Sequence, residues 1–140
     1  MSNIASQNIS TQQLFLGTFR SITGTYTSGG SAVTLKAGTI FGRNTSTSKV
    51  EPTQSDGSTG SQQPRYILVN DVSVAANTTV TLDLANVGRV NKLALVYYKS
   101  GDGFDTMVGT SGTIGDLLVS NSLLEIIGST EASTTDNVVS

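Results

Sequence analysis

Histidine, cysteine and tryptophan are absent from this chain of 140 residues, and only 13% of its residues are charged. Without histidine, a serine or threonine nucleophile lacks its usual general base. Without histidine and cysteine, a transition-metal site lacks its usual ligands. The absence of cysteine also fits synthesis in a cytoplasm without disulfide formation. These absences direct the search for function toward surfaces and assembly.

Positive charge is also scarce. The eight Lys and Arg residues are scattered singly, and the net charge is −2. A nucleic-acid surface needs several cations on one face, so residues such as Arg20, Arg43 and Arg89 are more typical of solvated or paired side chains. No apolar run reaches the roughly 20 residues that span a bilayer. The first residues lack the basic and apolar regions of a secretory signal. We expect no nucleic-acid partner, no membrane partner and no signal peptide.

The remaining reactive groups form no specific catalytic pattern. Lys99 and Ser100 are adjacent, but such adjacency is expected by chance in a serine-rich chain. The acidic loop Gly101–Asp105 lacks the ligand series of a calcium-binding loop and is more typical of a solvated turn. The glycine-rich segment 109–115 lacks the lysine of a phosphate-binding loop. None of the ten acidic residues stands out as one of a catalytic pair. We therefore expect no enzyme activity, no cofactor and no metal.

Serine and threonine make up more than a quarter of the chain, and valine is frequent. Thr and Val favour pleated, half-buried strands, and the low net charge is not that of an ordinary disordered chain. The length fits one domain. The composition predicts a mainly β domain with polar loops, of a kind found outside cells or in virions, and the pattern near the C-terminus, described below, adds one short helix.

Apolar alternation locates the strands. We expect an extended segment over Gly17–Gly30 and strands over Ala32–Arg43 (two runs with a glycine break between them), Tyr66–Val74, Thr78–Leu84 and Val90–Tyr98. Gly38 and Gly42 interrupt the first of these strands and indicate bends, or close approach of another backbone. Residues 44–49 and 55–63 are polar, and we expect the second of these loops to be fully exposed.

The C-terminal third predicts a helix followed directly by a strand. Thr113 is a suitable N-cap, and Asp116 lies in the first turn, where its charge complements the helix dipole. Asn121 is expected to end the helix in a left-handed conformation. Leu123–Ile127 then favours a strand, and residues 129–140 have the composition of a flexible tail.

The chain therefore divides into an N-terminal arm (1–17), a β-rich domain (18–128) and the tail. The arm is polar until its apolar end, Leu14-Phe15-Leu16-Gly17. Two interpretations stay open for it. Either its apolar side chains pack on the chain's own domain, or the arm becomes ordered only against a neighbouring subunit.

The order of the short segments resembles the lambda-type head decoration proteins of tailed bacteriophages. The resemblance covers about residues 8–128, with a three-residue insertion at 59–61. It rests on four blocks that occur in order. Its matching positions are Leu35, Gly38, Thr39, Gly42 and Arg43; Lys49–Pro52; Asp56, Gly57, Ser58, Gln63, Pro64, Ile67, Leu68, Asp71 and Val72; and Gly88–Asn91.

The resemblance implies a small domain of the β-tulip or β-barrel-like kind that forms homotrimers on the outer surface of the expanded head. It implies that the arm contacts the major capsid protein, and that the protein stabilises the shell against internal DNA pressure. Production in the host cytoplasm is implied as well. The contact residues would be Ile9 to Gly17, with Leu14, Phe15 and Leu16 as apolar anchor. The Gly17–Ser31 and 44–63 loops would face neighbours.

One alternative from another functional class remains open. A receptor-binding fibre or adhesin domain, gripping a host-surface glycan through its polar loops, would have the same low charge and the same strands. The arm separates the two hypotheses, because an adhesin should bind its sugar with the arm deleted.

Overall fold

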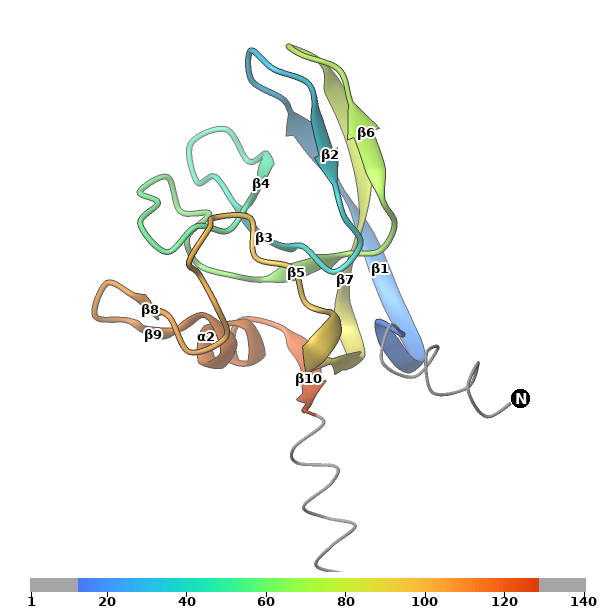
Figure 1. Ribbon diagram of the computed structural model, residues 1–140, viewed down its shortest axis with the longest axis vertical. Helices are drawn as coiled ribbons and strands as arrows, with labels where there is room; N and C mark the ends of the chain where they lie inside the picture. The colour runs from blue at the N-terminus through green and yellow to red at the C-terminus, as the bar shows by residue number, and fades with distance from the viewer. Residues whose placement is uncertain (1–12, 129–140) are drawn as a thin grey trace, which may run out of the picture.

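The computed structural model describes residues 13–128, which form a β-rich domain with one short α-helix, as the sequence predicts. Figure 1 shows two long strands side by side along the molecule, with a narrow ribbon at the upper end and the helix at the lower end. The strands are β1 (Phe15–Thr27), β2 (Val33–Leu35), β3 (Ile40–Arg43), β4 (Val50–Pro52), β5 (Tyr66–Leu68), β6 (Val72–Val74), β7 (Thr79–Asn91), β8 (Met107–Val108), β9 (Gly112–Thr113) and β10 (Leu123–Ile127).

The main sheet is open. Its strands follow the order β1-β7-β5-β3-β4, and β10 pairs in parallel with β7 beyond the end of β5. β2 and β6 form a separate antiparallel ribbon, and β8 and β9 form a short hairpin. Within residues 13–128, β1 and β4 terminate the sheet without pairing to each other, so the barrel-like form implied by the resemblance is not a closed one.

Two apolar clusters pack the ribbon and the helix against the main sheet. The first lies between the β2–β6 ribbon and the main sheet and includes Leu35, Phe41 and Leu82, each at most 1% exposed. The second lies under the helix and includes Ile67 and Leu118, both fully buried. β7 contributes to both clusters, because its alternating side chains extend the whole length of the domain.

The helix α2 (Ile114–Ser120) begins and ends where the sequence predicts. Thr113 is its N-cap and accepts a hydrogen bond from the Asp116 backbone N–H at 3.1 Å. β10 follows after two residues, as predicted. The prediction for Asn121 is wrong in one respect: its φ is −92°, so the helix ends without a left-handed residue, and the Asn121 N–H donates to Leu117 O.

Two predicted strands are wrong. Tyr66–Val74 divides into β5 and β6, which lie in different sheets, because the chain turns at residues 69–71. Val90–Tyr98 is not a strand. β7 ends at Asn91, whose side chain caps the 3₁₀ helix η1 (Lys92–Ala94), and beyond it only Val96 makes a bridge, with Thr39.

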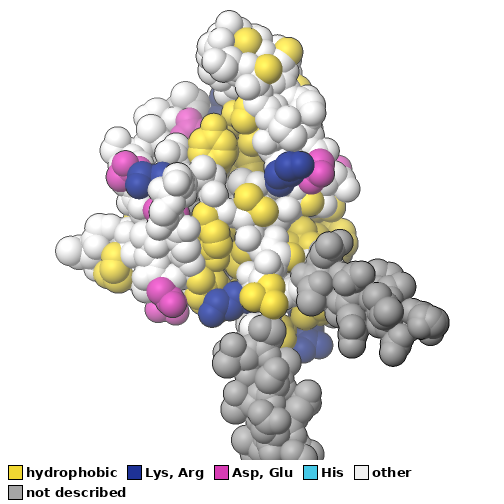
Figure 2. All heavy atoms as spheres, in the orientation of Figure 1, with side chains coloured by type: hydrophobic (Ala, Val, Ile, Leu, Met, Phe, Trp, Pro, Cys, Tyr) yellow, Lys and Arg dark blue, Asp and Glu magenta, His cyan; other side chains and the backbone are white. Residues whose placement is uncertain are grey.

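The loops are less exposed than predicted. Ser61, in the 55–63 loop, is only 6% exposed, because its side chain turns inward. The predicted extended segment over Gly17–Gly30 is confirmed up to Thr27, where β1 ends, so only residues 28–31 of the Gly17–Ser31 segment are loop. Figure 2 shows charged side chains as isolated groups with no continuous field of one sign on this face. Among residues 13–128, no helix has the length and apolarity to cross a membrane.

Candidate functional site

The root of the arm is fixed to the end of β7. The buried Asn91 donates from its backbone N–H to Leu14 O at 2.8 Å and from its side-chain Nδ2 to Gln13 O at 3.0 Å. The Oδ1 atom of the same carboxamide accepts from Leu93 N at 3.0 Å. One side chain therefore caps η1 and also holds the point from which the chain enters β1.

The apolar end of the predicted arm packs on the chain's own domain. Leu14 and Phe15 are half-buried against the second core cluster, and the Phe15 and Phe19 rings stack with centroids 4.0 Å apart. Leu16 is half-buried, whereas Gly17 is exposed. β1 begins at Phe15, so the predicted arm of residues 1–17 overlaps the first strand. Ile9 lies outside the described residues, and the capsid contact of Ile9 to Gly17 stays a prediction.

The outer edge of β1 has no strand partner within residues 13–128. Its first half is irregular on the paired side too: the register to β7 shifts between Phe15 and Phe19, and Gly17 has φ +135°. Opposite this bulge, Gly88 has φ +140°, and a Cβ there would lie 2.8 Å from Phe19 Cβ. Residues 17–21 are all exposed, so the arm root continues into an accessible strand edge.

The glycines of the first family block let other backbone segments approach closely, as predicted. A Cβ on Gly38 would lie 2.3 Å from Ala94 O, and one on Gly42 would lie 2.3 Å from Ser61 O. Most of the other block positions are structural as well. Leu35, Thr39, Pro52, Pro64, Ile67, Leu68 and Asn91 are buried, Gly57 and Gly88 are half-buried, and Asp56 and Asp71 are exposed. Asp71 accepts from Ala37 N at 2.7 Å and so ties the β2 end to the β6 start.

Glu51 organises the polar loops around β4. Its carboxylate accepts hydrogen bonds from Asn44 Nδ2 at 3.0 Å, Thr59 Oγ1 at 2.8 Å and Ser61 Oγ at 2.9 Å. Burial acts to raise the pKa of Glu51, but these three hydrogen bonds outweigh it and hold the pKa below its ordinary value. The contacts also explain why Ser61 is buried. Sequence reasoning missed this role, since the partners are seven to ten residues apart along the chain.

The acidic loop after Tyr98 joins another loop instead of being freely solvated. Asp102 accepts from Ser55 N at 2.9 Å and from Ser55 Oγ at 2.6 Å. Burial, followed by the nearby Asp105 charge, raises the pKa of the Tyr97 phenol to about 12. Over residues 13–128, no three His, Cys, Asp or Glu side chains gather as a metal-binding group.

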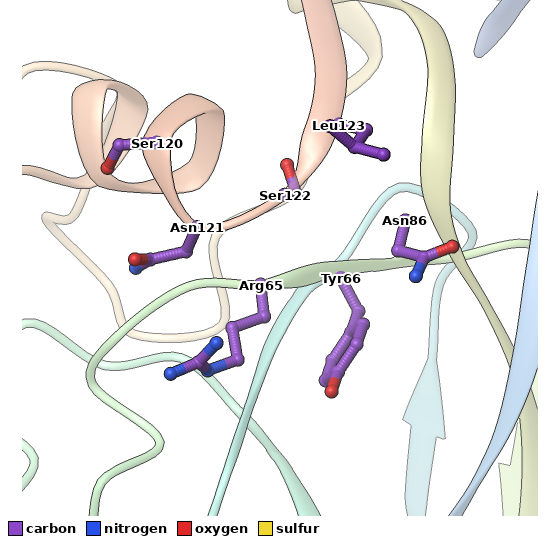
Figure 3. A pocket seen from close by; sticks show the side chains of 7 residues that line it. All are labelled: Arg65, Tyr66, Asn86, Ser120, Asn121, Ser122 and Leu123. Atoms are coloured by element: carbon purple, nitrogen blue, oxygen red, sulfur yellow. The ribbon is translucent and has the colours of Figure 1, made fainter.

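A polar hollow of about 380 Å³ lies where β5 and β10 diverge beside β7. In Figure 3, Arg65, Tyr66 and Asn86 lie next to one another below the end of α2. The same view shows Ser120, Asn121, Ser122 and Leu123 above them. The sequence predicts Tyr66 and Leu123 as the first residues of strands and Asn121 as the end of the helix, but nothing in the sequence indicates a hollow or singles out Asn86.

The open β-rich sheet, the glycine contacts and the fixed arm root together define a small structural domain with an accessible strand edge. Comparison with protein-family models gives its class: the chain belongs to the bacteriophage lambda head decoration protein D family, whose model matches residues 15–107. Head decoration proteins are structural components of the phage capsid. The matched residues include β1 through β7 and end at the first residue of β8. A comparison with curated proteins finds no match.

Proposed function

We propose that this protein is a cement protein that binds as trimers to the outer surface of the expanded phage head and stabilises it against internal DNA pressure. Family membership supports a decoration role, and the trimer and the site of attachment follow from the resemblance. A protein that binds only the expanded lattice stabilises that lattice by mass action. No catalysis is needed for this role.

The observation that carries the proposal is the accessible edge of β1 next to the fixed arm root. Asn91 holds Gln13 and Leu14 in place, and the exposed residues 17–21 follow within the same strand. A segment of the major capsid protein can pair with such an edge, or the arm can add a strand to the capsid protein's sheet. In both modes, backbone hydrogen bonds supply much of the affinity.

Co-sedimentation with purified heads tests the proposal. The full chain should pellet with expanded heads and stay in the supernatant with unexpanded heads. Sedimentation equilibrium of the free protein then reports whether it is a trimer in solution. Equal binding to both head forms, or binding to neither, would reject the cementing mechanism.

The decisive variant lacks residues 1–12. It keeps Gln13, Leu14 and every described strand, so it should fold as the full chain does. We expect it to lose binding to expanded heads. Retained binding would show that the arm is not required and would leave the β1 edge as the contact to examine.

A further inference from the structure

Arg65 is an exposed cation without a partner among residues 13–128: its guanidinium makes no ion pair or hydrogen bond with any of them. It lies on the wall shared by two hollows. The first, of about 380 Å³, also contains Asn86 and Asn121, and the second, of about 360 Å³, contains Arg43 and Asn44. Tyr66 lines both. No Asp or Glu lines either hollow, so a protein of net charge −2 has a locally positive depression here.

The strand arrangement creates the first hollow. β5 and β10 both pair with β7 but run in opposite directions, with Ile67 opposite Ala85 and Leu123 opposite Val87. Asn86 lies between these two pairs, at the point where the neighbouring strands separate. Small-molecule sites are concave and place a few polar groups that orient the ligand. The opening is therefore lined both by strand residues of the main sheet and by the connection from α2 to β10.

Several groups in the first hollow can still hydrogen-bond to a ligand. The Asn86 carboxamide makes no hydrogen bond with any described residue. Asn121 uses Nδ2 to donate to Pro64 O at 3.2 Å, and its Oδ1 remains an acceptor. The Tyr66 hydroxyl is not one of these groups, because it accepts from Arg43 Nε at 3.3 Å and Nη2 at 3.1 Å. Arg43 lines the second hollow, and in Figure 3 the hydroxyl points away from residues 120–123.

We propose that this hollow is a binding site for a carboxylate-bearing sugar, such as a uronic acid of a bacterial surface polysaccharide. The Arg65 fork matches a carboxylate in bidentate geometry. Side-chain amides and hydroxyls both donate and accept, as sugar hydroxyls do. The Tyr66 ring and the 76% exposed Leu123 provide apolar surface for the C–H groups of the sugar ring.

A peptide fits this site less well than a sugar. Peptide grooves gain affinity from unpaired strand backbone or from apolar anchor pockets. Here β5 is paired on both edges, to β7 and to β3, and Leu123 is the one aliphatic residue that lines the first hollow. The groups that line it are mostly polar side chains, as a sugar requires.

The position of the hollow is compatible with the capsid contact. Asn86 lies five residues before Asn91 on β7, about 16 Å along the strand from the arm root at about 3.3 Å per residue. The exposed β1 residues 19–21 pair with the part of β7 that contains Asn86, one strand away from it. β5 and β10 flank β7 on the side opposite β1, so the hollow and the β1 edge are on opposite sides of that strand. If the protein decorates the head in many copies, as proposed above, a weak single site gains from avidity.

A titration followed by amide NMR shifts tests the site on the full chain. The probe is sodium glucuronate, with glucose and sodium acetate as separate controls for the ring and the carboxylate. Saturable shifts at residues 65, 66, 86 and 120–123 with glucuronate alone are the expected result. Equal shifts with acetate would indicate anion binding only, and equal shifts with glucose would remove the role of the carboxylate. An absence of shifts, or tighter binding of a short acidic peptide, would also overturn the proposal.

Substitutions at Arg65 provide a second test of the site. Arg65→Gln should weaken glucuronate binding at least about tenfold. Arg65→Lys should weaken it less, because lysine keeps the positive charge but lacks the planar guanidinium that binds a carboxylate with two hydrogen bonds. Lys36→Gln, which removes an exposed charge elsewhere, should change nothing. Arg65→Gln should still co-sediment with expanded heads, so this site and the capsid function can fail independently. Loss of trimers in Arg65→Gln, with no effect on glucuronate binding, would show a subunit contact instead.

Discussion

The Asn91 carboxamide binds the carbonyl oxygen of Gln13, 78 residues earlier in the sequence, which accepts from Nδ2 at 3.0 Å. The Oδ1 atom of the same carboxamide accepts a hydrogen bond from Leu93 N. Asn91→Asp separates these two functions. The carboxylate can still cap η1, but it cannot donate a hydrogen bond to the Gln13 carbonyl oxygen. Its negative charge is also repelled by the partial negative charge of that oxygen. We expect a loss of about 1–3 kcal/mol in the free energy of unfolding and weaker binding to expanded heads.

Denaturant unfolding and head co-sedimentation measure the two effects. Asn91→Ala is the comparison variant, because it removes the cap as well and should destabilise at least as much. If Asn91→Asp matches the native chain in both assays, the hydrogen bond to Gln13 does not position the arm.

The last residues of the predicted arm belong to the described fold, because Leu14 packs on the second core cluster and β1 begins at Phe15. Deleting residues 1–12 should leave the melting temperature nearly unchanged. Deleting residues 1–17 also removes Leu14 and Phe15 from the second core cluster, at a cost of roughly 2–3 kcal/mol for two half-buried apolar side chains. Thermal unfolding by circular dichroism distinguishes the two deletions. Equal stability of both would show that the packing of Leu14 and Phe15 contributes little.

Gly42 marks a close approach of two backbones. A Cβ at this position would lie 2.3 Å from Ser61 O and 2.5 Å from Gln63 O, so the backbone must move. Gly42→Ala should destabilise by about 2–4 kcal/mol. Gly29→Ala is the matched control, because nothing lies within 4 Å of its Cβ, and its effect should stay within about 0.5 kcal/mol of zero or be slightly stabilising. Urea unfolding of the pair gives the difference.

Glu51 should make stability fall in acid. Its folded pKa lies below its unfolded value, so its contribution is present above the unfolded pKa and disappears as the pH falls through the folded pKa. At neutral pH, Glu51→Gln should cost about 0.5–1.5 kcal/mol, since the site is partly solvent-screened. The stability curves of the native chain and the variant should converge as the pH falls below 4.5, the ordinary value for this carboxyl. Parallel curves would contradict this role.

Local signals in the sequence predict the helix and the last strand well, although they do not give the end of β7. The Thr113 cap and the apolar positions after it predict α2, and Leu123–Ile127 predicts β10. Long apolar runs, such as Val90–Tyr98, are poorer predictors of strands. Leu95 is buried in the second core cluster without lying in a strand, because Asn91 turns the chain into η1. An apolar run whose residues are buried without forming a strand therefore has the same sequence pattern as a strand.

The candidate sites depend on contacts that a single sequence does not contain. The sequence predicts an apolar arm end, but the pairing of Asn91 with Gln13 and Leu14 brings together residues far apart in the chain. The hollow at Arg65 exists because β10 pairs in parallel with β7 next to β5. Neither Asn86 nor Leu123 has a local signal that would indicate a binding surface.

Asn91 also has β10 on its other side, where Ile127 is its partner in the parallel ladder. Leu14 and Ile127 are thus separated by two strand spacings, about 10 Å. A linker of a few residues between them would close the described domain into a ring. New termini could then be opened at the exposed Gly29–Gly30 turn, at the opposite end of β1. Such a circular permutant would keep every strand pair described above while moving both chain ends to the far end of the molecule.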